Sequence, residues 1–321
     1  MATFTAGAFG VDFDLLDLGP LAGAAQSFAT PTSVALTVAG VTTQAFGAGF
    51  QFAGSGPPTA GTIQRLIVSI DSGLAYDISG LDLSAASFRG WVTTGDNAGA
   101  KAGIFAGSDL MTGSAAADRL YGYGGDDTVS AGAGNDTLEG GAGRSYLRGD
   151  EGDDKVTGGA DFDDINGNMG HDTASGGLGD DWVVGGKDND LLFGDDGGDL
   201  VYGNLGNDTC DGGAGADIVR GGQGDDTLSG GAGADFVSGD RGNDTMTGGA
   251  GADLFHSSSD AGLDRVLDFS VAEGDRVLLD PGTTYTVSQV GGDTVITMSA
   301  GEVVLVGVSM SSLGAASIFL G

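Results

Sequence analysis

A nine-residue period, uninterrupted by insertion or deletion, constrains the fold of this chain more than any other feature. Stepping by nine from Asp109 to Asp253 gives seventeen positions, and sixteen of them are Asp, with Ser145 as the exception. The residue two places after each of these positions is apolar in every copy, from Met111 to Phe255. Because chance does not hold such a register over seventeen copies, the region must be a repeat architecture.

The composition of one copy predicts a tight coil of short strands. With the Asp numbered as position 6, each copy has six turn-forming residues followed by three extended ones, as in GGAGAD-FVS. Six residues are too few for a helix, and Gly supplies the positive φ angles that such a turn needs. Strand side chains alternate, so position 8 should point inward and positions 7 and 9 outward. We expect two copies to close one turn of a flattened solenoid, with equivalent loops about 4.8 Å apart.

The copies GGAGADFVS, GGQGDDTLS and GGLGDDWVV resemble the RTX nonapeptide, G-G-x-G-x-D-x-U-x, of the hemolysin-type calcium-binding proteins. The resemblance implies an all-β fold, a right-handed parallel β-roll flanked by β-rich regions. It predicts three parts: an N-terminal β-rich domain over residues 1–103, a β-roll of seventeen nonapeptides over 104–256, and a C-terminal β cap with a secretion signal over 257–321.

Carboxylates stacked at the spacing of adjacent loops would repel one another, and a hard cation that accepts carboxylate and carbonyl oxygens would remove the repulsion. The resemblance implies multiple Ca²⁺ ions, each between loops 18 residues apart. One row of predicted metal ligands is Asp118, Asp136, Asp154, Asp172, Asp190, Asp208, Asp226 and Asp244. The other row, which Asp109 begins, is Asp127, Asp163, Asp181, Asp199, Asp217, Asp235 and Asp253. The alternative is a polar turn array that binds no metal.

Some copies depart from the repeat, and we expect missing or altered ions there. Ser145 replaces the position-6 Asp in one loop, and Ala116, Asp161 and Asp188 replace the position-4 Gly. The first two loops, IFAGSD and GSAAAD, are degenerate.

Charge limits the partners that the chain can have. The formal net charge is −33, from 45 acidic and 12 basic side chains. Nucleic acids and anionic membrane surfaces would repel such a chain, and no stretch of about 20 apolar residues offers a membrane-spanning helix. We therefore expect no nucleic-acid partner and no direct membrane insertion. Cys210 is the only cysteine, so an intramolecular disulfide is impossible.

Both flanks are predicted to be strands. The N-terminal flank contains the runs SVALTVAG, RLIVSID and AYDISGLDL, and the C-terminal flank contains DRVLDF, DRVLLD, TYTVSQV, DTVITMS and EVVLVGVS. The first 19 residues lack a basic segment followed by a long apolar run, so a classical signal peptide is not expected. The C-terminal flank, with its apolar end SIFLG, resembles the uncleaved signal of type I substrates. That resemblance implies a secreted, extracellular or cell-surface protein with the type I secretion machinery as a partner.

The sequence predicts a protein that is not an enzyme. The only histidines are His171 and His256, so an H-E-x-x-H zinc site cannot form, and no G-x-S-x-G elbow is present. His171 is expected on the surface, because the fifth position of the repeat varies. A carboxylate pair among Asp12, Asp14 and Asp17 stays open as a site for polysaccharide cleavage.

The outward position 7 differs between the two strand sets. One set carries Leu110, Thr128, Tyr146, Asp164, Trp182, Leu200, Ile218, Phe236 and Leu254, and the other is mostly Thr. Because a flat apolar column should not face water, we expect a partner surface there. The leading hypothesis is a secreted calcium-binding structural protein that self-assembles into a layer, filament or matrix. The alternatives are a calcium-rigidified adhesin or glycan-binding module and a secreted enzyme of unrecognised type.

Overall fold

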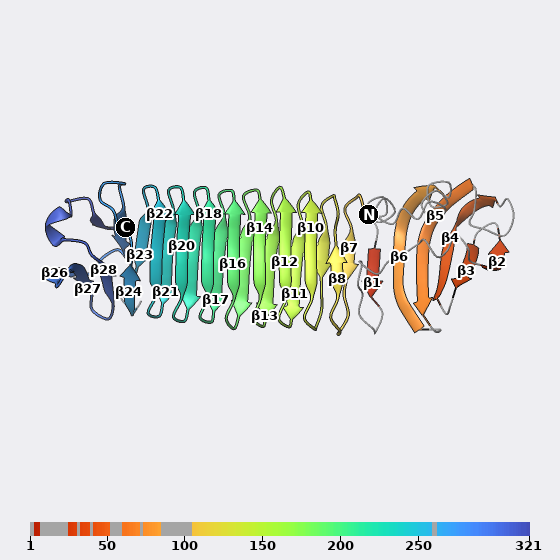
Figure 1. Cartoon of the computed structure of the whole chain (residues 1–321), viewed down its shortest axis with the longest axis horizontal. Coiled ribbons are helices and arrows are strands. Elements are labelled where there is room, and N and C mark those ends of the chain that lie inside the picture. Colours follow the sequence, from red (N-terminus) through yellow and green to blue (C-terminus); the bar gives the residue numbers. More distant parts are fainter. Residues whose placement is uncertain are drawn as a thin grey trace. The chain divides into compact units, whose positions relative to one another are not determined.

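The computed structural model describes residues 105–258 and 262–321 and, before them, the backbone of six strands (Figure 1). These six are β1 (Thr3–Ala6), β2 (Ala25–Thr30), β3 (Ser33–Val38), β4 (Val41–Gln51), β5 (Ala60–Ile70) and β6 (Gly73–Ser84). The described residues are strands and turns, with one short 3-10 segment, η3 (Met310–Ser312). The all-β prediction is therefore confirmed.

The repeats form a parallel solenoid in which residue n pairs with residue n+18, as Trp182 does with Leu200 and Leu200 with Ile218. Successive strands alternate between two sheets. The first sheet contains β7 (Leu110–Thr112), β9 (Thr128–Ser130), β11 (Tyr146–Glu151), β13 (Asp164–Met169), β15 (Trp182–Lys187), β17 (Leu200–Leu205), β19 (Ile218–Gln223), β21 (Phe236–Arg241) and β23 (Leu254–Ser257). The second contains β8 (Arg119–Tyr121), β10 (Thr137–Ala142), β12 (Lys155–Ala160), β14 (Thr173–Leu178), β16 (Leu191–Asp196), β18 (Thr209–Ala214), β20 (Thr227–Ala232) and β22 (Thr245–Ala250).

The chain divides into two compact units, residues 1–151 and 152–321, each with its own part of the solenoid. We name the two rows of turns by the strands that they enter. Edge 1 enters the second sheet and contains the aspartates from Asp118 to Asp244. Edge 2 enters the first sheet and contains those from Asp109 to Asp253. The predicted three-part domain division stays a prediction.

Side-chain alternation builds the core as expected. Position 8 is buried in all seventeen copies, including the small Ala174 and Cys210. Position 7 points outward, and Trp182 and Ile218 are 52% and 46% exposed. Since one apolar residue per copy fills the interior, the two sheets enclose a narrow core with one side chain from each strand.

The glycines of the repeat answer two separate demands. From the copy of Asp127 onward positions 2 and 4 have positive φ, so the non-Gly residues found there are mainly Asp and Asn, which tolerate this region: Asp150, Asn168, Asp195, Asn204 and Asp240 at position 2, and Asp161 and Asp188 at position 4. Tyr123 is the exception. Position 1 has ordinary φ but lies against the carboxylate of its own copy, so that a Cβ there would overlap the oxygen.

The C-terminal flank continues both sheets. β24 (Leu263–Val266) pairs in parallel with β22, and β25 (Arg276–Leu279) with β23. Outside them lie β28 (Glu302–Leu305) on β24 and β29 (Ile318–Leu320) on β25, while β26 (Thr286–Val290) and β27 (Asp293–Thr297) complete an antiparallel meander. The strands predicted in this flank are confirmed.

The N-terminal strands form an antiparallel array, β2 to β6, and β1 pairs antiparallel with β6. β1 also pairs in parallel with β7, with Thr3 opposite Leu110. A strand of the N-terminal flank therefore extends the first sheet at its first repeat strand. The carboxylate pair considered among Asp12, Asp14 and Asp17 lies outside the described residues.

Candidate calcium ladder

The position-6 aspartates form two internal ladders of hydrogen bonds. On edge 2 the backbone N–H of Asp217 donates to Oδ1 of Asp235 at 2.9 Å, and that of Asp199 to Oδ1 of Asp217 at 2.8 Å. On edge 1 the N–H groups of Asp190 and Asp208 donate in the same way, each to the aspartate 18 residues on. One carboxylate oxygen of each rung is thus committed to the preceding turn.

The second carboxylate oxygen of these aspartates, Oδ2, is unusual because it lacks a hydrogen-bond partner in many rungs. The Oδ2 atoms of eleven aspartates are buried and accept no hydrogen bond: Asp127, Asp172, Asp181, Asp190, Asp199, Asp208, Asp217, Asp226, Asp235, Asp244 and Asp253. All eleven side chains are at most 4% exposed. Burying an ionised carboxylate without a partner costs on the order of several kcal/mol of folding free energy. A row of such oxygens therefore requires protons or cations.

The surroundings of these oxygens fit calcium. A Cβ built on Gly230 would stand 2.6 Å from Oδ2 of Asp235 and 2.6 Å from the carbonyl oxygen of Gly248, one turn on. At Gly212 the same two kinds of oxygen lie 2.7 Å and 2.5 Å from that point. At these edge-2 glycines a carboxylate and a carbonyl of successive turns thus face one space, which a side chain would fill. Calcium takes mixed oxygen ligands of this type.

Among the residues that the structure describes, no three His, Cys, Asp or Glu side chains converge on one point. An ion between two turns would take backbone carbonyl oxygens beside the carboxylates, a mixed ligand set that calcium tolerates well. The predicted aspartates of both rows, including Asp109, Asp118, Asp136, Asp154 and Asp163, all lie buried on the two edges. Ligation by each individual residue stays a prediction.

Burial raises the pKa of the ladder carboxyl groups. It brings the pKa of Asp190 and Asp244 to about 8 and that of Asp226 to about 7, all on edge 1. On edge 2 it brings the pKa of Asp199 and Asp217 to about 6. In each case the bond from the preceding backbone N–H lowers the pKa and neighbouring carboxylates raise it, but desolvation dominates. Protons therefore compete with cations for these sites near neutral pH.

The departures from the repeat change the ladder locally. Oδ2 of Asp118, in the degenerate loop GSAAAD, accepts hydrogen bonds from Ser114, at 2.6 Å from its N–H and 3.0 Å from its hydroxyl. Protein donors thus occupy the oxygen that is partnerless in regular copies, in line with an altered site. Ser145 is buried at 1% exposure, but its side chain brings no carboxylate.

A second ladder, which the sequence did not predict, runs along the outside of edge 1 in residues 152–321. Position-5 side chains accept the backbone N–H 18 residues on: Asp153 from His171, Asn189 from Asn207, Asn207 from Asp225, and Asp225 from Asn243, at 2.8 to 2.9 Å. Nδ1 of His171 lies 3.1 Å from the nitrogen and 3.0 Å from the oxygen of Asn189. His171 is thus a surface residue, but its position does not vary freely.

A Ser–His–Asp chain joins the last repeats to the C-terminal strands. His256 Nδ1 lies 3.0 Å from Oγ of Ser238, and its Nε2 lies 3.2 Å from Oδ1 of Asp280. The Ser238 hydroxyl donates to Asp240 at 2.8 Å, and its side chain is fully buried. Ser238 therefore lacks the access and the free hydroxyl proton of a nucleophile. We interpret the trio as a structural link; the absence of enzymatic activity stays a prediction.

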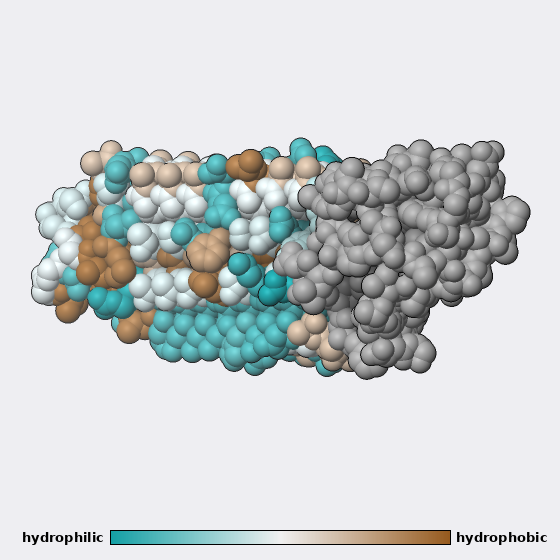
Figure 2. Space-filling model, turned by 45° about the vertical axis from the view of Figure 1, so that its right-hand side comes forward, coloured by the Kyte–Doolittle hydropathy of each residue, from teal (hydrophilic) through white to brown (hydrophobic). Residues whose placement is uncertain are grey.

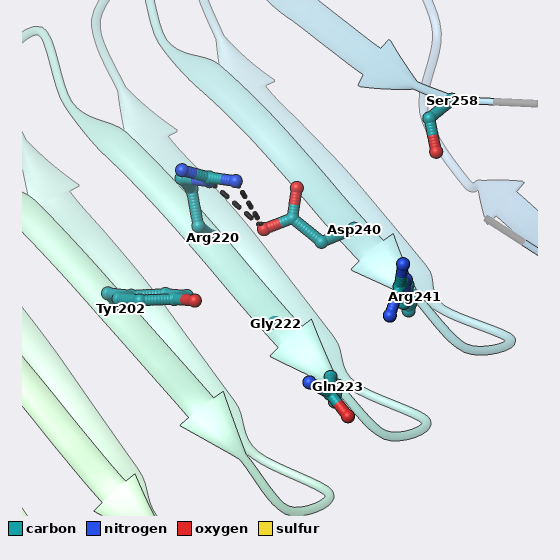
Figure 3. A pocket seen from close by; sticks show the side chains of 7 residues that line it. All are labelled: Tyr202, Arg220, Gly222, Gln223, Asp240, Arg241 and Ser258. Carbon is teal, nitrogen blue, oxygen red and sulfur yellow. Dashed lines mark hydrogen bonds and ion pairs between the residues drawn. The ribbon is translucent and has the colours of Figure 1, made fainter. Parts of the chain in front are cut away.

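The outer face of the first sheet carries the aromatic and cationic side chains (Figure 3). The guanidinium of Arg220 pairs with Asp240 at 2.7 Å and lies 5.4 Å from the centre of the Tyr202 ring. A hollow of about 280 Å³ is lined by these three residues with Gln223, Arg241 and Ser258 among others. An adjoining hollow of about 390 Å³ is lined by Ile218, Arg220, Phe236 and His256. In Figure 2 brown apolar groups interrupt the paler and teal surface of the repeats.

Comparison with known proteins identifies the repeats. The family model of the RTX calcium-binding nonapeptide repeat matches in overlapping segments from residue 105 to residue 262. No curated protein matches the chain. The solved AlgE6R3 subunit of the Azotobacter vinelandii mannuronan C5-epimerase is 27% identical over 37% of this chain and 78% of its own, with a TM-score of 0.29. The extracellular lipase LipA of Serratia marcescens is 18% identical over 67% of this chain and 40% of its own, with a TM-score of 0.31.

No helix of the described residues has the length and apolar character to cross a bilayer. The repeat period, the two buried aspartate ladders and the family match all lead to one assignment. The chain belongs to the RTX repeat proteins, and its nonapeptide repeats, over residues 105–262, bind calcium.

Proposed function

We propose that this is a secreted structural protein whose solenoid folds when extracellular calcium fills the ladders, and which then associates with further copies of itself. The observation that carries the proposal is the set of eleven buried Oδ2 atoms without a hydrogen-bond partner. Without cations these carboxylates oppose folding, so calcium binding and folding are linked.

The linkage suits a protein that is made inside a cell and works outside it. Extracellular calcium modules bind with dissociation constants of about 10⁻⁴ to 10⁻³ M, so such sites stay empty at cytosolic calcium levels. The Asp-rich and Gly-rich chain is then kept open by charge repulsion and backbone entropy. RTX repeats are characteristic of secreted proteins, and a type I exporter, recognising the C-terminal flank, would pass such an unfolded chain.

Self-association is proposed to use the outer column of the first sheet. In residues 152–321 this column contains Trp182, Leu200, Ile218, Phe236 and Leu254. Burying one large apolar side chain stabilises by about 1.5 to 3 kcal/mol, so several together are enough to determine association. Calcium would also reduce the repulsion between copies that a net charge of −33 creates.

The proposal is tested with the purified full chain in calcium and in chelator. Circular dichroism should change from coil to β on adding calcium, and electron microscopy should show ordered polymers only in calcium. Substituting Trp182, Ile218 and Phe236 by Ser should keep the calcium-induced fold and weaken association, because these side chains point outward. A fully folded chain in chelator contradicts the folding proposal; unchanged polymers of the triple variant contradict the lateral contact.

The second candidate function is a calcium-rigidified adhesin. The two adjoining hollows at Arg220 favour it, since they combine an ion pair, an aromatic ring and an apolar wall. A monomer in calcium that binds a glycan saturably, and loses that binding on Arg220→Ala, would support this function instead of self-association.

A further inference from the structure

The two hollows that share Arg220 lie on the outer face of the first sheet, away from the calcium ladders. Their lining comes from four successive strands of that sheet, from Tyr202 on β17 to His256 on β23. Hollows of about 280 Å³ and 390 Å³ lie near the lower end of the size range of small-ligand sites. The chemistry of their lining therefore indicates which ligand fits.

The first hollow is locally cationic on a strongly acidic chain. The chain has 12 basic and 45 acidic side chains, yet two arginines, Arg220 and Arg241, line this hollow. Among the described residues of its lining they face one carboxylate, that of Asp240. Charges more than about 8 Å away are largely screened at physiological ionic strength, so the lining outweighs the net charge of the chain. The hollow therefore favours a ligand group with one negative charge.

Contacts within the sheet hold Arg220 in position for such a group. Its Nε and Nη2 lie 3.0 Å and 2.7 Å from Oδ2 of Asp240, and its guanidinium lies 5.4 Å from the centre of the Tyr202 ring (Figure 3). Nη1 forms no hydrogen bond with the residues that the structure describes. A guanidinium that is already ordered loses little entropy when it donates to a carboxylate.

Two neutral polar groups face the same hollow. The Gln223 amide and the Tyr202 hydroxyl line it, and neither forms a hydrogen bond with the described part of the chain. An amide and a phenol can each donate and accept hydrogen bonds. The hollow thus offers partners for hydroxyl groups beside the site for an anion.

The adjoining hollow supplies ring faces and an apolar wall. The rings of Phe236 and His256 are stacked, with their centres 5.7 Å apart and their planes 24° apart, and Ile218 completes the wall. A sugar ring is built in a matching way, because it has hydroxyl groups at its edge and C–H groups on its faces. A sugar lying across both hollows would meet hydrogen-bonding groups in one and ring faces in the other.

The spacing of the strands favours a chain of sugars over a single sugar. Tyr202, Arg220 and His256 all occupy position 9 of first-sheet copies, and Tyr202 pairs directly with Arg220 across two neighbouring strands. Such strands lie about 4.8 Å apart, and an extended polysaccharide advances by a similar distance per ring. The Arg220 side chain is 44% exposed, so a polymer lying along the sheet can reach it.

We propose that this face binds an acidic polysaccharide, with a sugar carboxylate at Arg220 and Arg241 and a sugar ring over Phe236 and His256. The inference rests on the second candidate function, the calcium-rigidified adhesin, and gives the chemical class of its ligand. A carboxylate fits better than a doubly charged group, because two guanidinium groups and one carboxylate leave the lining with one net positive charge.

The test is isothermal titration calorimetry of the full chain in calcium with a short oligoglucuronate, at protein concentrations where sedimentation shows a monomer. A blank titration into calcium buffer corrects for ions bound by the sugar. The comparison ligand is the methyl ester of the same oligosaccharide, which keeps the rings and removes the charge. The ester should bind at least about ten-fold more weakly than the acid, because it loses a hydrogen-bonded ion pair with arginine.

Variants locate the binding on the proposed face. Arg220→Gln and Arg241→Gln should each weaken binding of the oligoglucuronate at least about ten-fold. Arg148→Gln is the matched control: Arg148 also occupies position 9 of a first-sheet copy, but its Nη1 donates to the carbonyl oxygen of Leu147 at 2.9 Å and it lines neither hollow. The control should bind like the parent.

Three results would overturn the proposal: no binding of the acid, equal binding of the acid and its ester, or unchanged binding by both arginine variants. Tighter binding of a sulfated oligosaccharide of the same length would overturn the choice of a carboxylate. If Arg220→Gln loses the calcium-induced β signal in circular dichroism, Gln223→Ala replaces it, because Gln223 is exposed; unchanged binding by this variant counts against the site. Polymers that form in calcium without any saccharide binding would overturn this inference and leave self-association intact.

Discussion

The two edges of the solenoid carry the same aspartate ladder but differ in what lies outside it. On edge 1, position 5 is Asp153, His171, Asn189, Asn207, Asp225 and Asn243, and these side chains bond to the backbone of the next turn. On edge 2, the position-5 residues after Asp180 are Gly198, Ala216, Ala234 and Ala252, whose side chains accept no hydrogen bond. Edge 1 therefore has a row of additional ties between turns that need no metal, whereas edge 2 has such a tie from the N–H of Gly198 to Asp180 and none at Ala216, Ala234 and Ala252.

The carboxyl groups do not divide by edge. Burial raises the pKa of Asp190 and Asp244 on edge 1 to about 8, but that of Asp172 on the same edge to about 6. On edge 2 it raises the pKa of Asp217 to about 6 and that of Asp127 to about 7. The expected difference between the edges therefore rests on the outer ladder. We therefore expect the two edges to differ in their dependence on calcium, and edge 2 should open first when calcium is removed.

The largest expected effect is that acid partly replaces calcium. Folded pKa values above the unfolded value of about 3.8 give stability that is fully present below pH 4 and is lost as pH rises through 6 to 8. In chelator, β structure measured by circular dichroism should therefore be greater at pH 4.5 than at pH 8, while in calcium the apparent affinity should fall on acidification. Equal metal-free signals at both pH values would show that the ladder carboxylates do not limit folding.

The next effect comes from the position-1 glycines. Gly230→Ala places a methyl group 2.6 Å from both Oδ2 of Asp235 and the carbonyl of Gly248, so that turn must shift and lose its ion. We expect a destabilisation of about 3 kcal/mol or more in calcium, measured by urea unfolding. The control is Gly198→Ala, where the nearest atoms are 3.5 Å away and the change should be within about 0.5 kcal/mol. Equal destabilisation by the two substitutions would show that the close approach of atoms at position 1 does not determine the loss of stability.

A smaller effect separates the edges directly. Asp217→Asn removes a predicted ligand next to Ala216, and Asp208→Asn removes a predicted ligand next to Asn207. Both variants should need more calcium to reach the midpoint of folding. Because the outer bond of Asn207 persists, the midpoint concentration of Asp208→Asn should be roughly two-fold to ten-fold lower than that of Asp217→Asn, which corresponds to about 0.5 to 1.5 kcal/mol for the persisting bond. If Asp208→Asn is the more damaging change, the outer ladder does not support edge 1.

The smallest effect isolates the outer ladder alone. Asn207→Ala should lower the free energy of unfolding by about 0.5 to 1.5 kcal/mol, because the N–H of Asp225 loses its acceptor. The reciprocal change, Ala216→Asn, offers an acceptor to the N–H of Ala234 on edge 2 and should stabilise the fold by a similar or smaller amount. Thermal melts in calcium measure both, and a destabilising Ala216→Asn would show that edge 2 cannot hold the outer bond.

Much of this architecture follows from the sequence because one repeat register determines the strand pairing and the burial pattern of every copy. The burial of Val183 and Val201, the inward Asp181 and Asp199 and the 18-residue pairing all follow from a single register. Position 5 looked variable because copies nine residues apart belong to opposite edges. Comparing copies 18 residues apart separates Asn189, Asn207 and Asn243 from Gly198, Ala216 and Ala252.

The contacts of the C-terminal flank could not be predicted, because no period connects them. Asp280 meets His256 across 24 residues, and Asp275 reaches Asp253 across 22. Their meeting depends on the lengths of the irregular turns after residue 258. The calcium count likewise depends on which second oxygens remain unpartnered, and that is a property of three-dimensional packing.

Amide hydrogen exchange of the ladder N–H groups, followed by NMR in calcium and in chelator, tests the central claim most directly. In calcium, the amides of Asp181, Asp199 and Asp217 on edge 2 and of Asp190 and Asp208 on edge 1 should all be strongly protected, because each donates to the next rung. As calcium is withdrawn at pH 7, the edge-2 amides should lose protection before the edge-1 amides. Protection that is unchanged in chelator would contradict the account, because calcium would then not be what holds the buried carboxylates in place.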